Sequence, residues 1–136
     1  MIIAFVLLVA TVPVLLGLAS PWGYRTVLAA GIATVLIVFG LCATGWGDLG
    51  EGREMADAVR MSVLVSVAAG LLVAASTTLG AFVRHVATDW HPAGRTLAWM
   101  LAIAATATVH LYGGFILAVV YAANVTCGID AYECPI

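Results

Sequence analysis

The chain has 136 residues, of which 64% are hydrophobic and only 9% are charged, and its net charge is -2. An average soluble domain has roughly 25% charged residues, so this composition excludes both a soluble globule with a polar surface and a disordered chain. The five basic residues are all arginine and lie scattered along the chain, which excludes a nucleic-acid-binding stripe.

Four apolar runs are long enough to cross a hydrocarbon core of about 30 Å, which takes about 20 helical residues. They cover residues 2–19, 26–46, 61–83 and 97–123, and none of them contains Asp, Glu or Arg. A helix satisfies its own backbone hydrogen bonds in lipid. We therefore expect an all-α membrane protein, a compact bundle of four transmembrane helices that forms a single domain over residues 1–136.

The first run is rich in Leu and Val, and Pro13 inside it predicts a kink. We expect a retained helix rather than a cleaved signal peptide, because no basic residue precedes the run and it exceeds the apolar core of about 7–15 residues typical of such peptides. This run has fewer small residues than the others. We therefore expect the first helix to have the most lipid contact, with the other three packed tightly together.

The second run contains Cys42, which we expect to pack as a small apolar side chain. The charged segment 51–60 follows and is expected to begin the third helix early, as a solvated helix end. A docking surface for a partner is the alternative for this segment.

Small side chains recur every four residues in the third run and share one face of the expected helix. The members of this stripe are Ser62, Ser66, Gly70, Ala74 and Thr78. The fourth run offers Ala102, Thr106 and Gly113 at similar spacing. Small residues let membrane helices approach closely, so we expect both sets to be packing surfaces. The alternative is that such residues are merely frequent in a protein whose composition indicates a high-GC genome.

His110 is an ionisable residue near the middle of the longest run, where such groups are costly and often functional. It could bind haem iron, with Met100 or a partner subunit as the second ligand, or it could relay protons. The runs contain no second His and no carboxylate to assist either role. We therefore expect a hydrogen bond to a Thr hydroxyl or a carbonyl across the bundle and predict no cofactor, with haem and proton roles as alternatives.

His85, Asp89 and His91 lie in the connection before the fourth run. These residue types can bind zinc, but Trp90 and Pro92 indicate an interfacial turn. We favour a solvated loop over a metal site.

The tail, residues 124–136, contains Cys127 and Cys134. They could close a disulfide loop in an oxidising compartment, and free thiols or a metal pair are the alternatives.

An even number of spans places both termini on one side of the membrane. The first and third connections then share a face that bears Arg25, Arg84, Arg95 and Asp89, a net charge of +2. The other face bears two arginines and six acidic residues, a net charge of -4. The positive-inside rule favours both termini on the outer side of the cell membrane. A disulfide between Cys127 and Cys134 agrees with this orientation, because disulfides form in oxidising compartments.

No nucleophile elbow, Walker loop or dinucleotide-binding motif occurs, and we expect no enzymatic activity. The expected role is an accessory subunit, assembly factor or scaffold of a larger membrane complex. Its partners would be the lipid bilayer and either other membrane subunits or further copies of itself. The alternatives are a small oligomeric transporter or channel that uses the third run and His110 as a polar path, and a haem or redox subunit that uses His110.

Overall fold

The computed structural model describes the backbone of residues 2–19, 23–44 and 53–127, and the side chains of residues 11–19, 23–44 and 55–123. In these ranges the chain is helical, as predicted, and forms no strand. The elements are α1 (Ile2–Ala19), α2 (Tyr24–Ala43), α3 (Arg53–Val86) and α4 (Pro92–Cys127).

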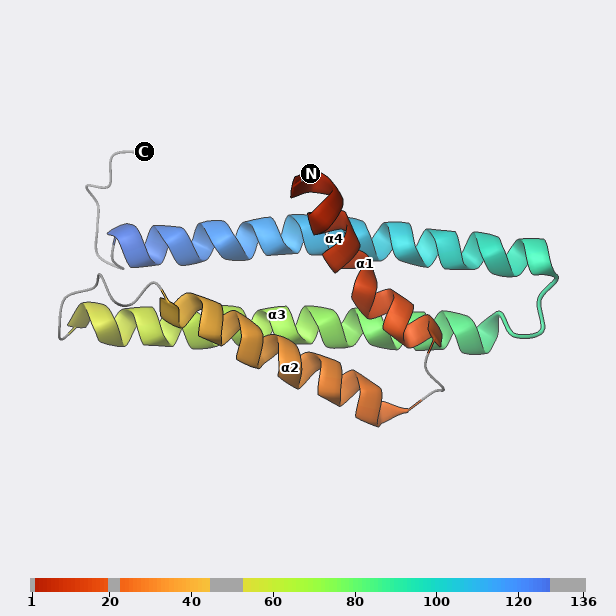
Figure 1. Ribbon diagram of the computed structural model, residues 1–136, viewed down its shortest axis with the longest axis horizontal. Coiled ribbons are helices and arrows are strands. Elements are labelled where there is room, and N and C mark those ends of the chain that lie inside the picture. The colour runs from red at the N-terminus through yellow and green to blue at the C-terminus, as the bar shows by residue number, and fades with distance from the viewer. Residues whose placement is uncertain (1, 20–22, 45–52, 128–136) are drawn as a thin grey trace.

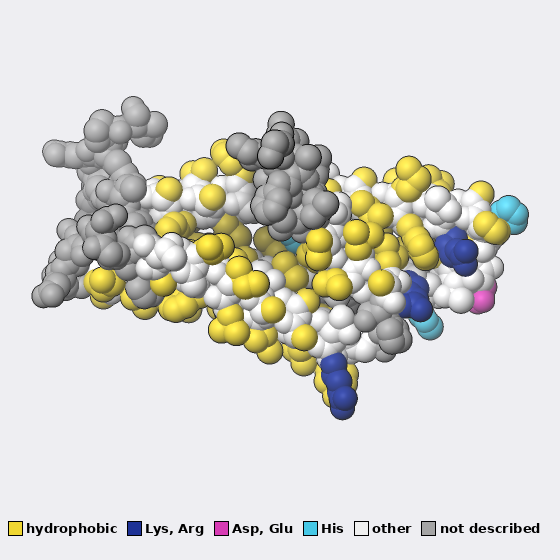
Figure 2. Space-filling view, in the orientation of Figure 1, with side chains coloured by type: hydrophobic (Ala, Val, Ile, Leu, Met, Phe, Trp, Pro, Cys, Tyr) yellow, Lys and Arg dark blue, Asp and Glu magenta, His cyan; other side chains and the backbone are white. Residues whose placement is uncertain are grey.

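Three segments are long and apolar enough to span a membrane: Tyr24–Ala43, Met55–Val86 and Pro92–Ala123. Hydrophobic side chains also cover much of the described surface in Figure 2. Both findings are consistent with a membrane location. At 1.5 Å per residue, α3 and α4 are each about 50 Å long, so their ends extend beyond a hydrocarbon core of about 30 Å.

The helices α3 and α4 form a long antiparallel hairpin (Figure 1). The start of α3 at Arg53 confirms the expected early start in the charged segment. Its last turn passes into a tight connection, in which the Trp90 N–H donates to the Ala87 carbonyl oxygen at 3.2 Å. Pro92 is the first residue of α4, a position at which its missing N–H leaves no hydrogen bond unmade.

The central helix is α3, which contacts each of the other three helices. In Figure 1, α2 runs obliquely along α3, and the C-terminal half of α1 also lies on α3. The same figure shows that α1 changes direction partway along its length. Pro13 lies inside this helix, and the loss of one backbone hydrogen bond at a proline accounts for such a bend.

The expectation that the first helix has the most lipid contact is wrong for its C-terminal half. Pro13, Val14, Gly17 and Leu18 are all buried, and Val14 and Leu18 form a core cluster with Ala102 of α4. The helix with no buried residue is α2, which was expected to be tightly packed. The reason is local, because Gly17 of α1 and Gly80 of α3 let the two backbones approach each other directly.

Candidate functional site

The crossing of α1 and α3 is a contact between two backbones. A Cβ atom on Gly17 would clash with the Thr77 carbonyl oxygen and lie 2.8 Å from the Ala81 nitrogen. A Cβ atom on Gly80 would clash with the Val14 carbonyl oxygen and lie 3.2 Å from the backbone nitrogen of Leu18. Backbone atoms cannot turn aside as side chains do, so only glycine fits at both positions.

The middle of the predicted stripe on α3 faces α2. A Cβ atom on Gly70 would clash with the Val35 side chain and lie 3.0 Å from the Gly31 carbonyl oxygen. Ala74 lies nearby, with its Cβ 3.5 Å from the position that a Cβ on Gly31 would occupy. This part of the stripe is a helix-packing surface. The backbones approach each other less closely here than at the α1 crossing, because the Val35 side chain is part of the contact.

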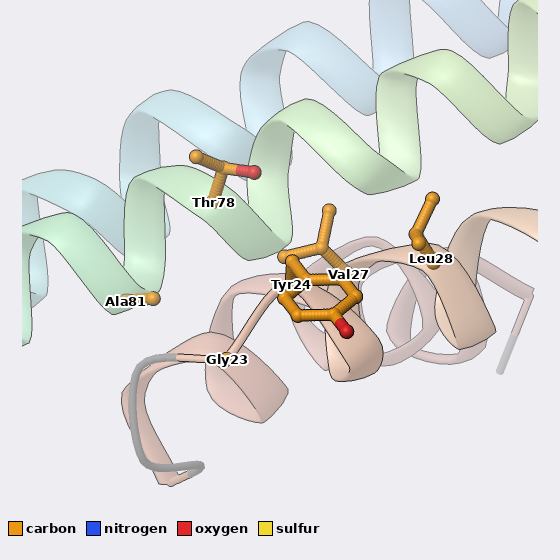
Figure 3. Close-up of a pocket in the computed structure, with 6 residues that line it drawn as sticks. All are labelled: Gly23, Tyr24, Val27, Leu28, Thr78 and Ala81. Atoms are coloured by element: carbon orange, nitrogen blue, oxygen red, sulfur yellow. The ribbon is translucent and has the colours of Figure 1, made fainter.

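The stripe ends beside a cleft of about 300 Å³ at the start of α2. Thr78 is exposed and lines this cleft together with Ala81 of α3. Tyr24, Val27 and Leu28 of α2 lie opposite them in Figure 3. The Thr78 hydroxyl donates to the Ala74 carbonyl oxygen of its own helix, so the cleft is mainly apolar.

Near the start of α3, Ser62 and Ser66 are fully buried. The Ser62 hydroxyl lies 3.5 Å from the hydroxyl of Tyr121 on α4, which in turn donates to the Cys42 carbonyl oxygen on α2 at 3.4 Å. Tyr121 therefore joins three helices at one end of the bundle. Sequence reasoning did not single it out, and its place opposite Ser62 depends on the register of the α3–α4 hairpin.

The buried hydroxyl groups donate within their own helices. Ser76 donates to the Leu72 carbonyl oxygen and Thr77 to the Val73 carbonyl oxygen, each at 2.8 Å. The same bond to the residue four positions earlier occurs at Ser62, Ser66 and Thr106. These donors are therefore already used, and the buried hydroxyls of the described residues do not form a chain of free donors across the bundle.

His110 is half-buried, and its Nδ1 atom lies 2.9 Å from the Thr106 carbonyl oxygen and 3.5 Å from the Ser76 hydroxyl. A carbonyl oxygen only accepts, so Nδ1 carries a proton and donates in this contact. The shorter contact is thus to its own helix, and only the longer one crosses the bundle. The Nε2 atom is buried and has no hydrogen-bond partner among the described residues.

Met100 cannot complete a haem site with His110. It lies ten residues earlier on the same helix, a rise of about 15 Å, and its side chain is exposed.

The metal-binding residue types do not gather in the described part of the chain. His85, Asp89 and His91 are exposed, and no group of three His, Cys, Asp or Glu side chains among the described residues could hold a metal ion. Cys42 is a free thiol. The side chains of Cys127 and Cys134 lie outside the described residues, so their predicted disulfide stays a prediction.

On α4, Ala102 and Thr106 are buried, and Gly113 is half-buried. A Cβ atom on Gly113 would lie 3.1 Å from Leu72 Cδ1 on α3. Beside this contact an open groove of about 440 Å³ runs between α3 and α4. Its lining is apolar and consists of Ala68, Leu71, Leu72, Ala75, Gly113, Ile116 and Leu117.

Apart from Gly113, sequence reasoning missed this groove. Ala68 and Ala75 are seven residues apart and share one face of α3, which was the available signal. The described residues thus combine an apolar groove with a half-buried imidazole whose Nε2 atom has no hydrogen-bond partner among them. The chain matches no protein-family model, and neither a curated protein nor a solved structure matches it.

Proposed function

We propose that this protein is a non-catalytic component of a larger complex in the cell membrane, as an accessory subunit, assembly factor or scaffold. The observation that carries the proposal is the apolar groove between α3 and α4. The small residues Ala68, Ala75 and Gly113 leave room between the larger side chains of the lining, and small residues allow a further helix to approach closely in lipid. The proposed occupant is a transmembrane helix of another subunit.

The proposal includes a four-span bundle with both termini outside the cell. The burial of Val14, Gly17 and Leu18 against the hairpin supports α1 as the fourth span. The arginine distribution supports the orientation. A disulfide between Cys127 and Cys134 would fit the same side.

A transporter or channel is a weaker candidate. Such a protein needs polar groups that face a path, whereas Ser76, Thr77 and Thr106 donate to their own helices. The bundle also shows no carboxylate within the described parts of α2, α4 or the apolar part of α3. Solute flux through the purified protein in vesicles, if it is lost in His110→Ala, would favour the transporter or channel role over the accessory role.

The candidate role as a haem or redox subunit depends on one observation, namely that the Nε2 atom of His110 has no hydrogen-bond partner among the described residues. An imidazole nitrogen with a free lone pair is a haem ligand, although the second ligand would have to come from a partner. Purification in mild detergent followed by visible absorption tests it. A Soret band that disappears in His110→Ala would favour the redox role over the accessory role.

Site-specific photo-cross-linking in native membranes tests the main proposal. A photoreactive residue at Leu71 lies in the groove, and one at Leu36 on α2 is the matched control, since the two leucines are 65% and 67% exposed. We expect position 71 to form an adduct with one other membrane protein and position 36 to form none. Adducts with lipid or with further copies of this chain alone would contradict the proposal.

A further inference from the structure

Two basic side chains lie near the end of the molecule where α3 joins α4, and a third projects separately from the start of α2 (Figure 2). Arg84 belongs to the last turn of α3, Arg95 to the first turns of α4, and Arg25 to the first turn of α2. The acidic residue described in this connection is Asp89, which is exposed. This end therefore has a net positive charge next to long apolar helices.

Two nitrogen donors at this end are buried and have no hydrogen-bond partner among the described residues, namely one terminal nitrogen, Nη1, of Arg84 and the indole Nε1 of Trp99. Buried donors are nearly always paired, and a charged donor is the most costly to leave unpaired. The described residues thus contain two donors without an acceptor among them, and a bound ligand could supply that acceptor.

Both donors border the C-terminal half of α1. Trp99 packs against the core cluster that contains Leu18. Arg84 lies one helical turn after Gly80, whose would-be Cβ is 3.2 Å from the Leu18 nitrogen. Arg84 of α3 and Trp99 of α4 therefore both belong to the part of the bundle that packs around Leu18.

Arg95 adds a third group. Its guanidinium carbon lies 5.8 Å from the centre of the Trp99 ring, a cation–π arrangement. A cation–π contact does not use the guanidinium N–H groups as hydrogen-bond donors. Arg95 is itself exposed, so these N–H groups are accessible to a ligand.

We propose that Arg84, Arg95 and Trp99 bind the phosphate group of an anionic membrane phospholipid. A phosphate offers several acceptor oxygens with negative charge, and the arginine fork matches its geometry. These residues lie at the helix ends, where a bilayer places its headgroups. By the arginine distribution, they also lie on the cytoplasmic side, where anionic lipids attract basic groups. The apolar cleft of Figure 3 is close by, since Ala81 precedes Arg84 by one turn, and it offers a surface for an acyl chain.

Native mass spectrometry of the full-length protein in neutral detergent tests this site, with phosphatidylglycerol and phosphatidylcholine as probes. We expect phosphatidylglycerol to bind more tightly than phosphatidylcholine. Arg84→Gln should weaken phosphatidylglycerol binding about tenfold, because it removes a charge-assisted donor. The control is Arg60→Gln, an exposed arginine at the opposite end of α3, which should leave the affinity unchanged.

Arg84→Lys and Trp99→Phe are more conservative substitutions that test the site even if Arg84→Gln fails to fold. The lysine keeps the charge and the phenylalanine keeps the ring, so each should fold and bind phosphatidylglycerol about threefold more weakly. The proposal is overturned if these variants and Arg84→Gln bind as the wild type does, or if Arg60→Gln is weakened equally. It is also overturned if phosphatidylcholine binds as tightly as phosphatidylglycerol.

Inorganic phosphate separates the two sources of a phosphate group. A lipid site should keep phosphatidylglycerol in the presence of millimolar phosphate, because the acyl chains add apolar contacts that the free ion lacks. Displacement of the lipid by inorganic phosphate would overturn the lipid assignment in favour of a site for the free anion.

Discussion

Two glycine pairs join neighbouring helices to α3, and they differ in what they bring together. At the α1 crossing, Gly17 meets Gly80, the nearest atoms are all backbone, and the surrounding residues are buried. At the contact between α2 and α3, which we call the α2 seam, Gly31 meets Gly70, and the Val35 side chain is part of the contact. The stripe of small residues on α3 therefore gave a contact that includes a side chain, whereas Gly17 of the Leu- and Val-rich α1 and Gly80 of α3 gave a contact between backbones alone.

The largest expected effect is at the α1 crossing. Gly17→Ala or Gly80→Ala should each destabilise the protein by about 3 kcal/mol, because the new methyl group forces two backbones apart. Equilibrium unfolding in mixed detergent micelles measures the loss.

The control for this prediction is Gly40→Ala on α2. A Cβ there would meet nothing within 4 Å, and alanine has a helix propensity higher than glycine by about 1 kcal/mol. Gly40→Ala should therefore be neutral or stabilising. A loss at Gly40 as large as that at Gly17 would show that the effect belongs to helical glycine in general and not to the crossing.

An intermediate effect is expected at the α2 seam. Gly70→Ala should cost about 1–2 kcal/mol, since the Val35 side chain must shift while the Gly31 carbonyl oxygen stays 3.0 Å away. Gly31→Ala should change little, because its nearest atoms lie 3.4 and 3.5 Å from the new Cβ. The same unfolding assay ranks the two. The comparison of the two pairs fails if Gly31→Ala destabilises more than Gly17→Ala.

The smallest effect is expected at the far end of the α2 seam. Tyr121→Phe removes a hydroxyl whose contacts to Ser62 and Cys42 are long, at 3.5 and 3.4 Å. Side-chain hydrogen bonds between membrane helices average about 0.6 kcal/mol, so the loss should not exceed that value. Protease accessibility of α2 should stay unchanged. Release of α2 in this variant would mean that Tyr121, rather than the Gly70 contact, holds the helix in place.

The helical class and the approximate limits of the helices were predictable from the apolar runs, because length and uncharged composition decide whether a segment can span lipid. The place of α1 was not. Pro13 and Gly17 are four residues apart and both are buried, yet among large apolar residues they do not stand out as a packing face. The residues around Gly17 in the sequence do not predict which other helix it contacts.

The state of His110 was predictable only in part. Its intramembrane position was evident, but the choice between a bond across the bundle and one within α4 depends on its rotamer and on the register of α3 against α4. The same register places Ser76 at 3.5 Å from the ring and Tyr121 beside Ser62. It also aligns Ala68 and Ala75 with Gly113 to form the groove, which neither helix encodes alone.

Purification of the native complex tests most directly whether the groove between α3 and α4 receives a helix of another subunit. Ala75→Leu fills the groove, and Ala105→Leu makes the same change at an exposed alanine of α4 outside it. We predict that the wild type and Ala105→Leu each purify with the same partner subunit, while Ala75→Leu folds but purifies without it. A partner that stays bound to Ala75→Leu would contradict the account.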